Sequence, residues 1–486
     1  MEFHSISYLL FFPLTALFYF LIPEKYRKYF LLIASYYFYM SWNIQYGFLM
    51  LFETILTYWC ARKIEKVKKE EQRFYLWLGV GGPLLILFVF KYLGFFFDNI
   101  SFLFHLFEFP LTISVVDFIL PVGISFFTFQ AIGYLVDVYR KNVKPETDFL
   151  KYALFISFFP QLVAGPIERS KNLLSQIHEK QSFTVENFQR RLLKILAGYF
   201  MKLMIADRCA IVVNEVFQNA HLYGWGYVII ATILFSFQIY CDFAGYSLIA
   251  IGSARIIGFR LTENFNAPYL SRSIQEFWNR WHITLSHWLR DYVYIPLGGS
   301  RVSRIKKYRN ILLVFTLSGL WHGANWGFII WGLLHGCYRV ISEVTKTIRK
   351  QIRSFFHLKE DAQVTIWMQR FLTFMLVAFS FLFFRAENFS KMNEIIEFSF
   401  HYQPWSKLSQ VNGLGMSMIN WVILAISLFL LLGVSLYKQK RSIYQIFQKQ
   451  SFFTRLFFVA LFLILLLIFG IYGPAFHASE FIYFRF

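Results

Sequence analysis

The sequence predicts an all-α polytopic membrane protein, and two observations carry this prediction. The 486 residues are 57% hydrophobic and 21% aromatic, with 62 phenylalanines, and only 16% are charged, against roughly a quarter in ordinary globular domains. Apolar stretches long enough to cross a hydrocarbon core of about 30 Å also recur from the first residues to the last. Only a bilayer can cover so much apolar surface, so membrane lipid is the first predicted partner.

Apolar blocks along the chain predict the individual spans. The first block lacks the basic region and cleavage site of a secretory signal, so it predicts a retained span. The second is long enough for two short passes. No fixed-period repeat or linker separates the blocks, so residues 1–486 are expected to form a single membrane domain. The blocks are residues 5–22, 29–61, 75–97, 115–138, 149–165, 226–256, 310–341, 366–384, 417–437 and 456–476.

Lysines and arginines gather in short clusters between the apolar blocks and account for the formal net charge of +20. The positive-inside rule assigns such clusters to cytoplasmic loops, which argues against nucleic acid as a partner. The same rule places both termini outside the cytoplasm. The clusters are residues 25–28, 62–73, 140–151, 301–309, 346–353 and 438–455.

The block 310–341 has a cytoplasmic signature at both ends, because basic clusters flank it on either side. About 32 residues are too few for two full spans, so we expect two short or re-entrant helices that meet inside the membrane. Ser318-Gly319 and the run from Gly323 to Asn325 are the expected break. Broken helices are tolerated at that depth only where they line a packed or watery cavity.

The stretch 167–225 mixes charged and apolar residues at helical spacing. This pattern predicts helices that lie along the membrane surface. Asp242, by contrast, is a carboxylate inside an apolar block and is expected to orient an Arg or Tyr. The four cysteines are widely spaced and lie in or beside apolar segments, so they predict small core residues and no metal site.

His322 is the first candidate for chemistry, since an ionisable residue inside an apolar span is costly and is a functional candidate by default. It lies twelve positions after Asn310, about 18 Å along a helix, and therefore near mid-membrane. An imidazole in apolar surroundings stays neutral, as a general base requires. The alternative is a structural histidine at a helix break. Its neighbours Trp321 and Asn325 are candidates for lining a tunnel or positioning substrate.

A second polar concentration spans residues 276–292. On a continuous helix, Trp278, His282 and Ser286 share one face, which makes His282 the inward candidate and the other two candidate tunnel or positioning residues. His282 and His287 are five positions apart and do not form the i, i+4 pair of a metal site. For His287, anchoring of an interfacial helix is the favoured interpretation.

Five segments together resemble the bacterial branch of the membrane-bound O-acyltransferases, above all the type that O-acetylates alginate or peptidoglycan. They are residues 121–130 (PVGISFFTFQ), 158–167 (FFPQLVAGPI), 265–270 (FNAPYL), 277–299 and Trp321-His322-Gly323. The resemblance covers nearly the whole chain. It implies a ring of about 10–12 transmembrane helices, some broken or re-entrant, around a central tunnel. It also implies that His322 is the main catalytic residue and that His282 is its upstream partner.

The resemblance further implies the reaction. An acetyl group passes from a cytoplasmic thioester, acetyl-CoA or another acyl thioester, across the bacterial cytoplasmic membrane, with no bound cofactor. An extracytoplasmic SGNH-hydrolase-like acetyltransferase then transfers it to an envelope polysaccharide or peptidoglycan. Two alternatives stay open. One is D-alanyl transfer to teichoic acid, and the other is a transporter or flippase with mid-membrane proton-relay residues.

The last six residues, FIYFRF at 481–486, suggest an additional role. A similar aromatic tail with a tyrosine ends several members of this branch and a small partner in teichoic-acid D-alanylation. The hypothesis is that Tyr483 accepts the acyl group with the help of His322 and passes it to the partner transferase. The alternative is an aromatic anchor at the membrane interface.

Overall fold

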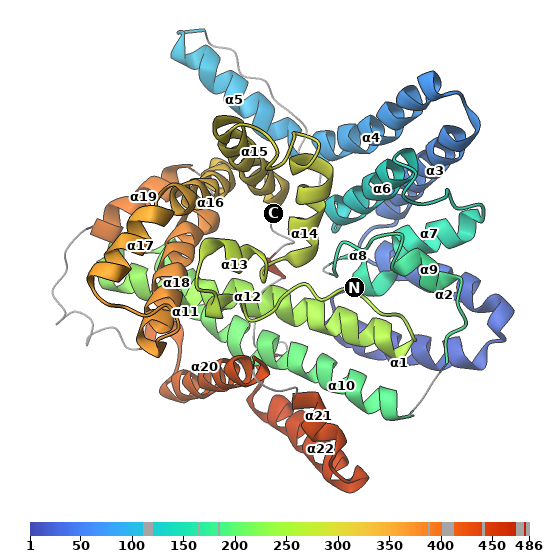
Figure 1. The fold of residues 1–486 in the computed structure, drawn as a ribbon. Helices are drawn as coiled ribbons and strands as arrows, with labels where there is room; N and C mark the ends of the chain where they lie inside the picture. The colour runs from blue at the N-terminus through green and yellow to red at the C-terminus, as the bar shows by residue number, and fades with distance from the viewer. Residues whose placement is uncertain are drawn as a thin grey trace. The chain divides into compact units, whose positions relative to one another are not determined.

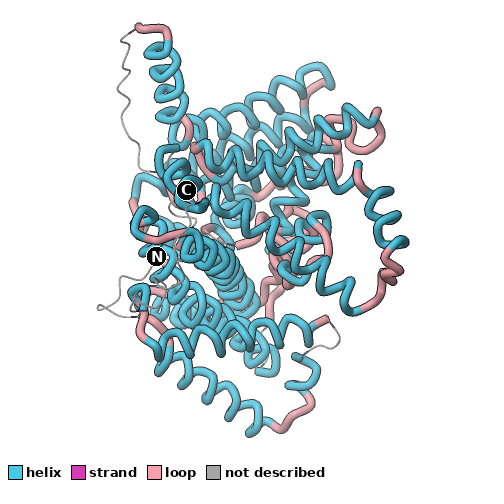
Figure 2. The backbone as a smooth tube through the Cα atoms, turned by 90° about the vertical axis from the view of Figure 1, so that its left-hand side faces the viewer, coloured by secondary structure: helices cyan, strands magenta, loops and turns pink. Residues whose placement is uncertain are grey.

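The computed structural model describes residues 1–109, 120–163, 165–182, 185–386, 389–400, 413–439, 443–472 and 481–482. Within these residues every regular element is a helix and none is a strand (Figures 1 and 2). The predicted all-α fold is therefore confirmed. The chain divides into two compact units, the first comprising Met1–Leu192 and Ala250–Glu263, the second Leu193–Ile249 and Asn264–Phe486.

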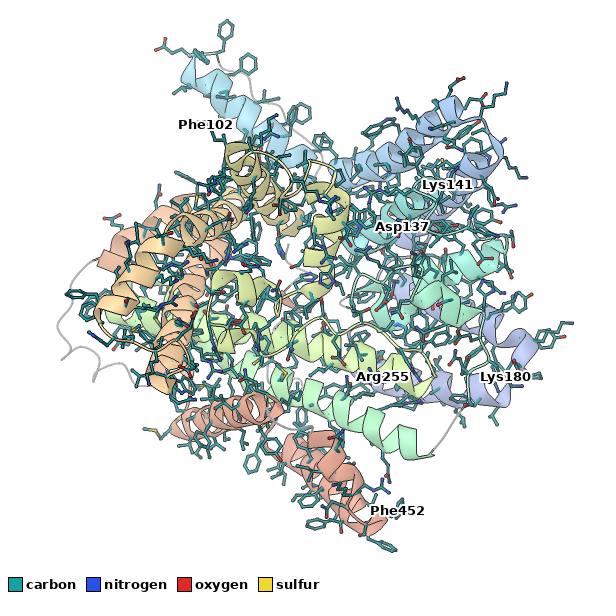
Figure 3. All side chains as sticks on the ribbon, in the orientation of Figure 1. Phe102, Asp137, Lys141, Lys180, Arg255 and Phe452 are labelled. Carbon is teal, nitrogen blue, oxygen red and sulfur yellow. The ribbon has the colours of Figure 1, made fainter. Side chains whose placement is uncertain are left out.

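Five helices in the described part of the chain are long and apolar enough to cross a membrane. Each overlaps one of the apolar blocks predicted from the sequence. The five are α4 (Lys69–Lys91), α12 (Trp225–Ile256), α18 (Gln363–Arg385), α20 (Met418–Lys438) and α22 (Phe452–Phe469). The outer faces of these helices carry large apolar side chains, such as Phe452 at the start of α22 (Figure 3). A lipid environment suits such a surface better than water.

The first unit is built around α6 (Ile124–Tyr139), which is buried along almost its whole length and packs against α3 (Ile44–Lys66) and α4. Thr128 on α6 donates a hydrogen bond of 3.0 Å to the carboxylate of Glu53 on α3. The block 29–61 forms two helices, as predicted. The remaining helices are α1 (Ile6–Leu21), α2 (Glu24–Met40), α5 (Leu93–Leu106), α7 (Phe149–Ser157), α8 (Phe159–Leu162) and α9 (Leu173–Ile177).

Helix α10 (Val185–Tyr199) leads from the first unit into the second. The second unit holds all the candidate site residues that the structure describes. Besides α12, α18, α20 and α22, it contains the π-helix η1 (Phe200–Ala206), α11 (Asp207–Gln218), α13 (Ile274–Trp278), α14 (Ile283–Leu289), the π-helix η4 (Arg290–Tyr294), α15 (Arg304–His322), α16 (Trp326–Val344), α17 (Lys346–Phe355), α19 (Phe389–Phe400) and α21 (Ile443–Gln448).

The prediction of surface helices for residues 167–225 is wrong for the stretch around Lys202. Lys202, Asp207 and Arg208 are buried. A close crossing makes this possible, because a Cβ on Gly198 of α10 would lie 2.6 Å from the carbonyl oxygen of Gly245 on α12. With glycine on both sides the two backbones touch, and the following turn carries Lys202 into the core. Ion pairing between segments far apart in sequence then makes burial of the charges tolerable.

Helices α15 and α16 form an antiparallel hairpin, joined by the three residues 323–325. A Cβ on Gly319 would overlap the carbonyl oxygen of Phe328, and a Cβ on Gly332 would overlap that of Phe315. The two ends of the hairpin therefore lie on the same side, as the flanking basic clusters predict. The break at Gly323–Asn325 is also confirmed.

Two details of this prediction were wrong. Ser318-Gly319 is continuous helix and serves as the point where the two backbones touch. The helices are not short, since each has 19 residues. They are longer than expected because each continues past the apolar block into its flanking polar residues.

Replacing Gly319 by alanine is expected to destabilise the hairpin by about 1–3 kcal/mol, because the added methyl group must push the two backbones apart. The measurement is the midpoint of thermal unfolding of the purified protein in detergent. Gly433→Ala in α20 is the matched control, since a Cβ there meets no atom within 4 Å and alanine favours the helix. Equal midpoints for the two variants would contradict the close contact.

Candidate active site

His322 is the last residue of α15 and lies at the closed end of the hairpin. Its side chain is buried. The ring of Trp331 on α16 stands perpendicular to the imidazole with centroids 5.1 Å apart, and Phe384 on α18 stands at 5.3 Å. The hairpin turn and α18 together place this histidine in an aromatic enclosure that keeps bulk water away.

His282 lies in a break between α13 and α14 and not on a continuous helix, which corrects the prediction for this segment. Its backbone is left-handed, with φ 42° and ψ 54°, a conformation that costs energy for a residue with a Cβ. The side chain is nevertheless fully buried, as predicted. It faces inward because the chain turns at this residue.

Asn264 holds the turn at His282 from a segment eighteen residues upstream. Its side-chain oxygen accepts hydrogen bonds from the backbone N–H and the hydroxyl of Thr284, at 3.2 and 3.0 Å. The same oxygen lies 3.3 Å from Nδ1 of His282. An amide oxygen only accepts, so this contact assigns the ring proton to Nδ1 and leaves the lone pair on Nε2. His282 lies outside the five candidate spans, and burial lowers its pKa to about 3, so it is neutral.

The two histidines predicted from sequence come together, although forty residues separate them. The centroids of the His282 and His322 rings are 6.4 Å apart. Trp321 packs against both, at 5.5 Å from His282 and 5.0 Å from His322. The neutral imidazole of His282, with its lone pair on Nε2, thus lies beside the imidazole of His322 in surroundings that exclude bulk water. Such an arrangement suits proton transfer to and from a substrate hydroxyl.

The other predicted positioning residues have identifiable structural contacts. Trp278 donates its indole N–H to Nδ1 of His335 at 3.2 Å. Ser286 is half-buried, and its hydroxyl lies 3.4 Å from the backbone oxygen of Trp281. It lies on α14 whereas Trp278 ends α13, so the two do not share one helix face as predicted. Asn325 caps α16 by accepting the backbone N–H of Gly327 at 2.8 Å. Of the three, Trp278 packs against Trp331, which borders His322.

Two residues of the site were missed from the sequence, His335 and Trp331 on α16. Both nitrogens of His335 are engaged, Nδ1 by Trp278 and Nε2 by the hydroxyl of Ser380 at 3.0 Å, so it has the contacts of a structural histidine. The indole nitrogen of Trp331 is buried with no acceptor in the described part of the chain. An indole N–H beside His322 is a donor that a substrate oxygen could engage.

The C-terminal tail reaches this site. Tyr483 itself lies outside the described residues. The two residues before it are buried, and the ring of Phe481 stacks on Tyr246 of α12 with centroids 4.2 Å apart. Phe243, also on α12, lies 5.9 Å from Phe481 and 4.8 Å from His282. A single phenylalanine ring therefore separates the start of the tail from His282.

A buried ion cluster anchors the tail. The carboxylate of Asp242 accepts the backbone N–H of Ile482 at 2.7 Å. The ammonium of Lys202 lies 2.8 Å from that carboxylate and 2.9 Å from the carboxylate of Asp207. Asp242 is thus a structural carboxylate, as expected, but its partners are a lysine and a backbone amide in place of the predicted Arg or Tyr. Removing Lys202 would take away the ammonium that pairs with both buried carboxylates.

Cysteines take no part in this arrangement. All four are free, and three of them, Cys60, Cys209 and Cys241, are buried. Among the residues that the structure describes, no group of three His, Cys, Asp or Glu side chains is placed to hold a metal ion.

Comparison with known proteins gives a consistent picture. A family model, the membrane-bound O-acyltransferase family, matches residues 142–386. The probable alginate O-acetylase AlgI of Pseudomonas aeruginosa is 38% identical over 408 residues, which cover 83% of this chain and 75% of that protein. The peptidoglycan O-acetyltransferase of Helicobacter pylori is 36% identical over 401 residues, covering 76% and 73%. The teichoic acid D-alanyltransferase of Bacillus subtilis is 31% identical over 288 residues, covering 55% and 69%.

Proposed function

Since this chain belongs to the membrane-bound O-acyltransferase family and is an O-acyltransferase, we propose that it carries an acetyl group across the membrane for O-acetylation of an envelope polysaccharide or peptidoglycan. The donor is a cytoplasmic thioester, acetyl-CoA in the simplest case. The chain lies in the bacterial cytoplasmic membrane with both termini outside. A separate extracytoplasmic transferase of the SGNH-hydrolase type completes the transfer. The similarity to an alginate O-acetylase and a peptidoglycan O-acetyltransferase supports the acetyl group.

The observation that carries this proposal is the pairing of His282 and His322 in a buried aromatic enclosure within one unit. Both histidines are buried, and an ionisable side chain in apolar surroundings is a functional candidate. Their pairing with each other distinguishes them from His335, which has the contacts of a structural histidine. We assign the role of general base to His322. His282, with its lone pair on Nε2, positions the donor or the acceptor.

The first chemical step transfers the acetyl group to Tyr483. His322 accepts the proton of the phenol as its oxygen attacks the thioester carbonyl. The carbon–sulfur bond breaks, the thiolate takes the proton back from the imidazolium, and a tyrosyl ester and a free thiol result. The N–H of Trp331 is a suitable donor to the carbonyl oxygen as negative charge develops on it. The anchoring of Ile482, the residue before Tyr483, supports this step.

In the second step a hydroxyl of the partner transferase attacks the tyrosyl ester, which restores the phenol of Tyr483. The partner then passes the acetyl group to a hydroxyl of the polymer. In this scheme the thioester never crosses the membrane, because the acyl group moves from one face of the enclosure to the other.

D-alanyl transfer to teichoic acid is the alternative, and the similarity to a D-alanyltransferase over 55% of the chain keeps it in view. The polytopic transporter is set aside, because the family consists of acyltransferases. The two acyl groups can be distinguished chemically, because D-alanyl carries an amine and acetyl does not.

Deletion of the gene is expected to remove O-acetyl groups from one envelope polymer, and a plasmid copy should restore them. Mass spectrometry of alkali-released groups from purified polysaccharide, peptidoglycan and teichoic acid identifies which acyl group disappears. Loss of D-alanine with unchanged acetate would establish the alternative. Unchanged levels of both would overturn the proposed function.

A further inference from the structure

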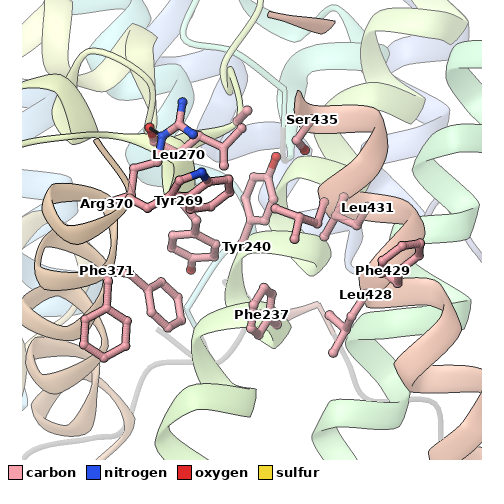
Figure 4. A pocket seen from close by; sticks show the side chains of 14 residues that line it. Phe237, Tyr240, Tyr269, Leu270, Arg370, Phe371, Leu428, Phe429, Leu431 and Ser435 are labelled. Carbon is pink, nitrogen blue, oxygen red and sulfur yellow. Dashed lines mark hydrogen bonds between the residues drawn. The ribbon is translucent and has the colours of Figure 1, made fainter. Parts of the chain in front are cut away.

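A cavity of about 460 Å³ in the second unit lies apart from the histidine pair. Helices α12, α18 and α20 and the segment around Tyr269 form its walls (Figure 4). The walls are almost wholly apolar, and rim residues such as Phe371 and Phe429 are exposed. Its size is in the range of small-molecule binding sites. The cavity therefore opens on a surface that the membrane interior covers.

One end of the cavity is polar and the other is not. Figure 4 shows the guanidinium of Arg370 and the hydroxyl of Ser435 toward one end, and Phe237 and Leu428 toward the other. A ligand that fits this distribution has a charged or polar head and a long apolar body. Membrane phospholipids have this form.

Arg370 has no carboxylate partner within the described ranges. Its guanidinium donates to the backbone oxygen of Leu270 and the side-chain oxygen of Gln439, both at 3.1 Å, and packs over the ring of Trp367. These two neutral acceptors engage only part of the five N–H donors of an arginine. An arginine in an apolar span without a counter-ion is costly, so an anionic ligand would stabilise it.

The surroundings of Arg370 add positive charge. Arg272 and Arg280 lie within electrostatic range of its guanidinium, together with Glu276. Glu276 is already paired with Arg280 at 2.7 Å. The charges around Arg370 are therefore positive on balance.

We propose that the cavity binds an acyl chain of an anionic phospholipid from the bilayer, with the lipid phosphate on Arg370. A guanidinium fork matches a phosphate through two parallel hydrogen bonds. Arg370 lies seven residues after the start of α18, about 10 Å along the helix, which suits the headgroup depth of a bilayer. The basic helix α17 directly precedes α18, and such segments attract anionic lipid.

The bound lipid would contact the wall of the histidine site. Tyr240 and Tyr269 line the cavity, and each packs against Trp281 with centroids 6.1 and 6.2 Å apart. Trp281 directly precedes His282. The lipid thus supports the turn that holds His282, although the binding site does not depend on the reaction assigned above.

Native mass spectrometry of the full-length protein in detergent tests the site, with dioleoylphosphatidylglycerol and dioleoylphosphatidylcholine as probes. We expect the wild type to retain the anionic lipid at least tenfold better than the zwitterionic one. Arg370→Gln should lose this preference. The matched control, Arg73→Gln on the exposed face of α4 in the first unit, should keep it.

Ser435→Trp, which fills the polar end of the cavity, should lower retention of the anionic lipid as well. Arg370→Lys keeps the charge without the fork and should retain part of the preference, and it replaces Arg370→Gln if that variant does not fold. Equal retention of the two lipids by the wild type, or an unchanged preference in Arg370→Gln, would overturn the proposal.

Discussion

Replacing His322 by alanine is expected to abolish O-acetylation while the protein still accumulates in the membrane. A general base contributes typically 10²–10⁴ in rate, so acetylated polymer should fall by at least a hundredfold. We attribute this loss to the missing general base, because neither neighbouring imidazole is placed to replace it. His335 has both nitrogens engaged, and His282 stands 6.4 Å away on a different backbone turn.

Two further variants separate catalysis from packing at this position. His322→Gln retains much of the side-chain volume between Trp331 and Phe384 but cannot take up a proton, so it should be as inactive as His322→Ala. His287→Ala removes an exposed histidine from α14 and is the matched control that should keep activity. Polymer acetylation at the wild-type level in His322→Ala would refute the assignment.

The long spans were predictable because their signal is local. Composition alone identifies α12, α18, α20 and α22, since an apolar run of this length rarely occurs outside a membrane span. The hairpin was predictable as well, from two basic clusters that had to lie on one side. The close approach of the two backbones at Gly319 was mistaken for a break, because a glycine can serve either purpose.

The shape of the site was less predictable, because it depends on contacts between distant segments. Periodicity placed His282 on a continuous helix, whereas Asn264 holds it in a left-handed turn. The charges near Lys202 resembled a surface helix until the close crossing of Gly198 and Gly245 placed them in the core. Neither the left-handed turn nor the close helix crossing can be recognised from the sequence of the segment that it affects.

His335 could have been found. The rule that singled out His322, an ionisable residue inside an apolar span, applies equally to His335 thirteen residues later. The structure shows why the rule alone does not identify a base. Both ring nitrogens of His335 have partners, Trp278 and Ser380, which hold the side chain in place. A structural histidine can therefore be told from a catalytic one only when such partners are known.

Replacing Tyr483 by phenylalanine is expected to stop acetyl transfer, because it removes the one oxygen that the relay needs and keeps the ring. The tail should stay anchored, since its attachment to Asp242 is through the backbone N–H of Ile482. Acetylated polymer should fall to the level of the gene deletion. Tyr472→Phe, at an exposed tyrosine nearer the end of α22, is the matched control and should keep activity.

A second measurement observes the intermediate itself. When the partner transferase is missing, the acetyl group cannot leave, so the C-terminal peptide should carry an ester that mild alkali removes. Tyr483→Phe should abolish this ester, and His322→Gln should prevent its formation. Asp242→Ala, which releases the backbone of Ile482, should reduce the ester because the residues directly before Tyr483 lose their anchor. Activity retained in Tyr483→Phe would end the relay hypothesis and favour direct transfer from the thioester to the partner, with the histidine pair unchanged in its role.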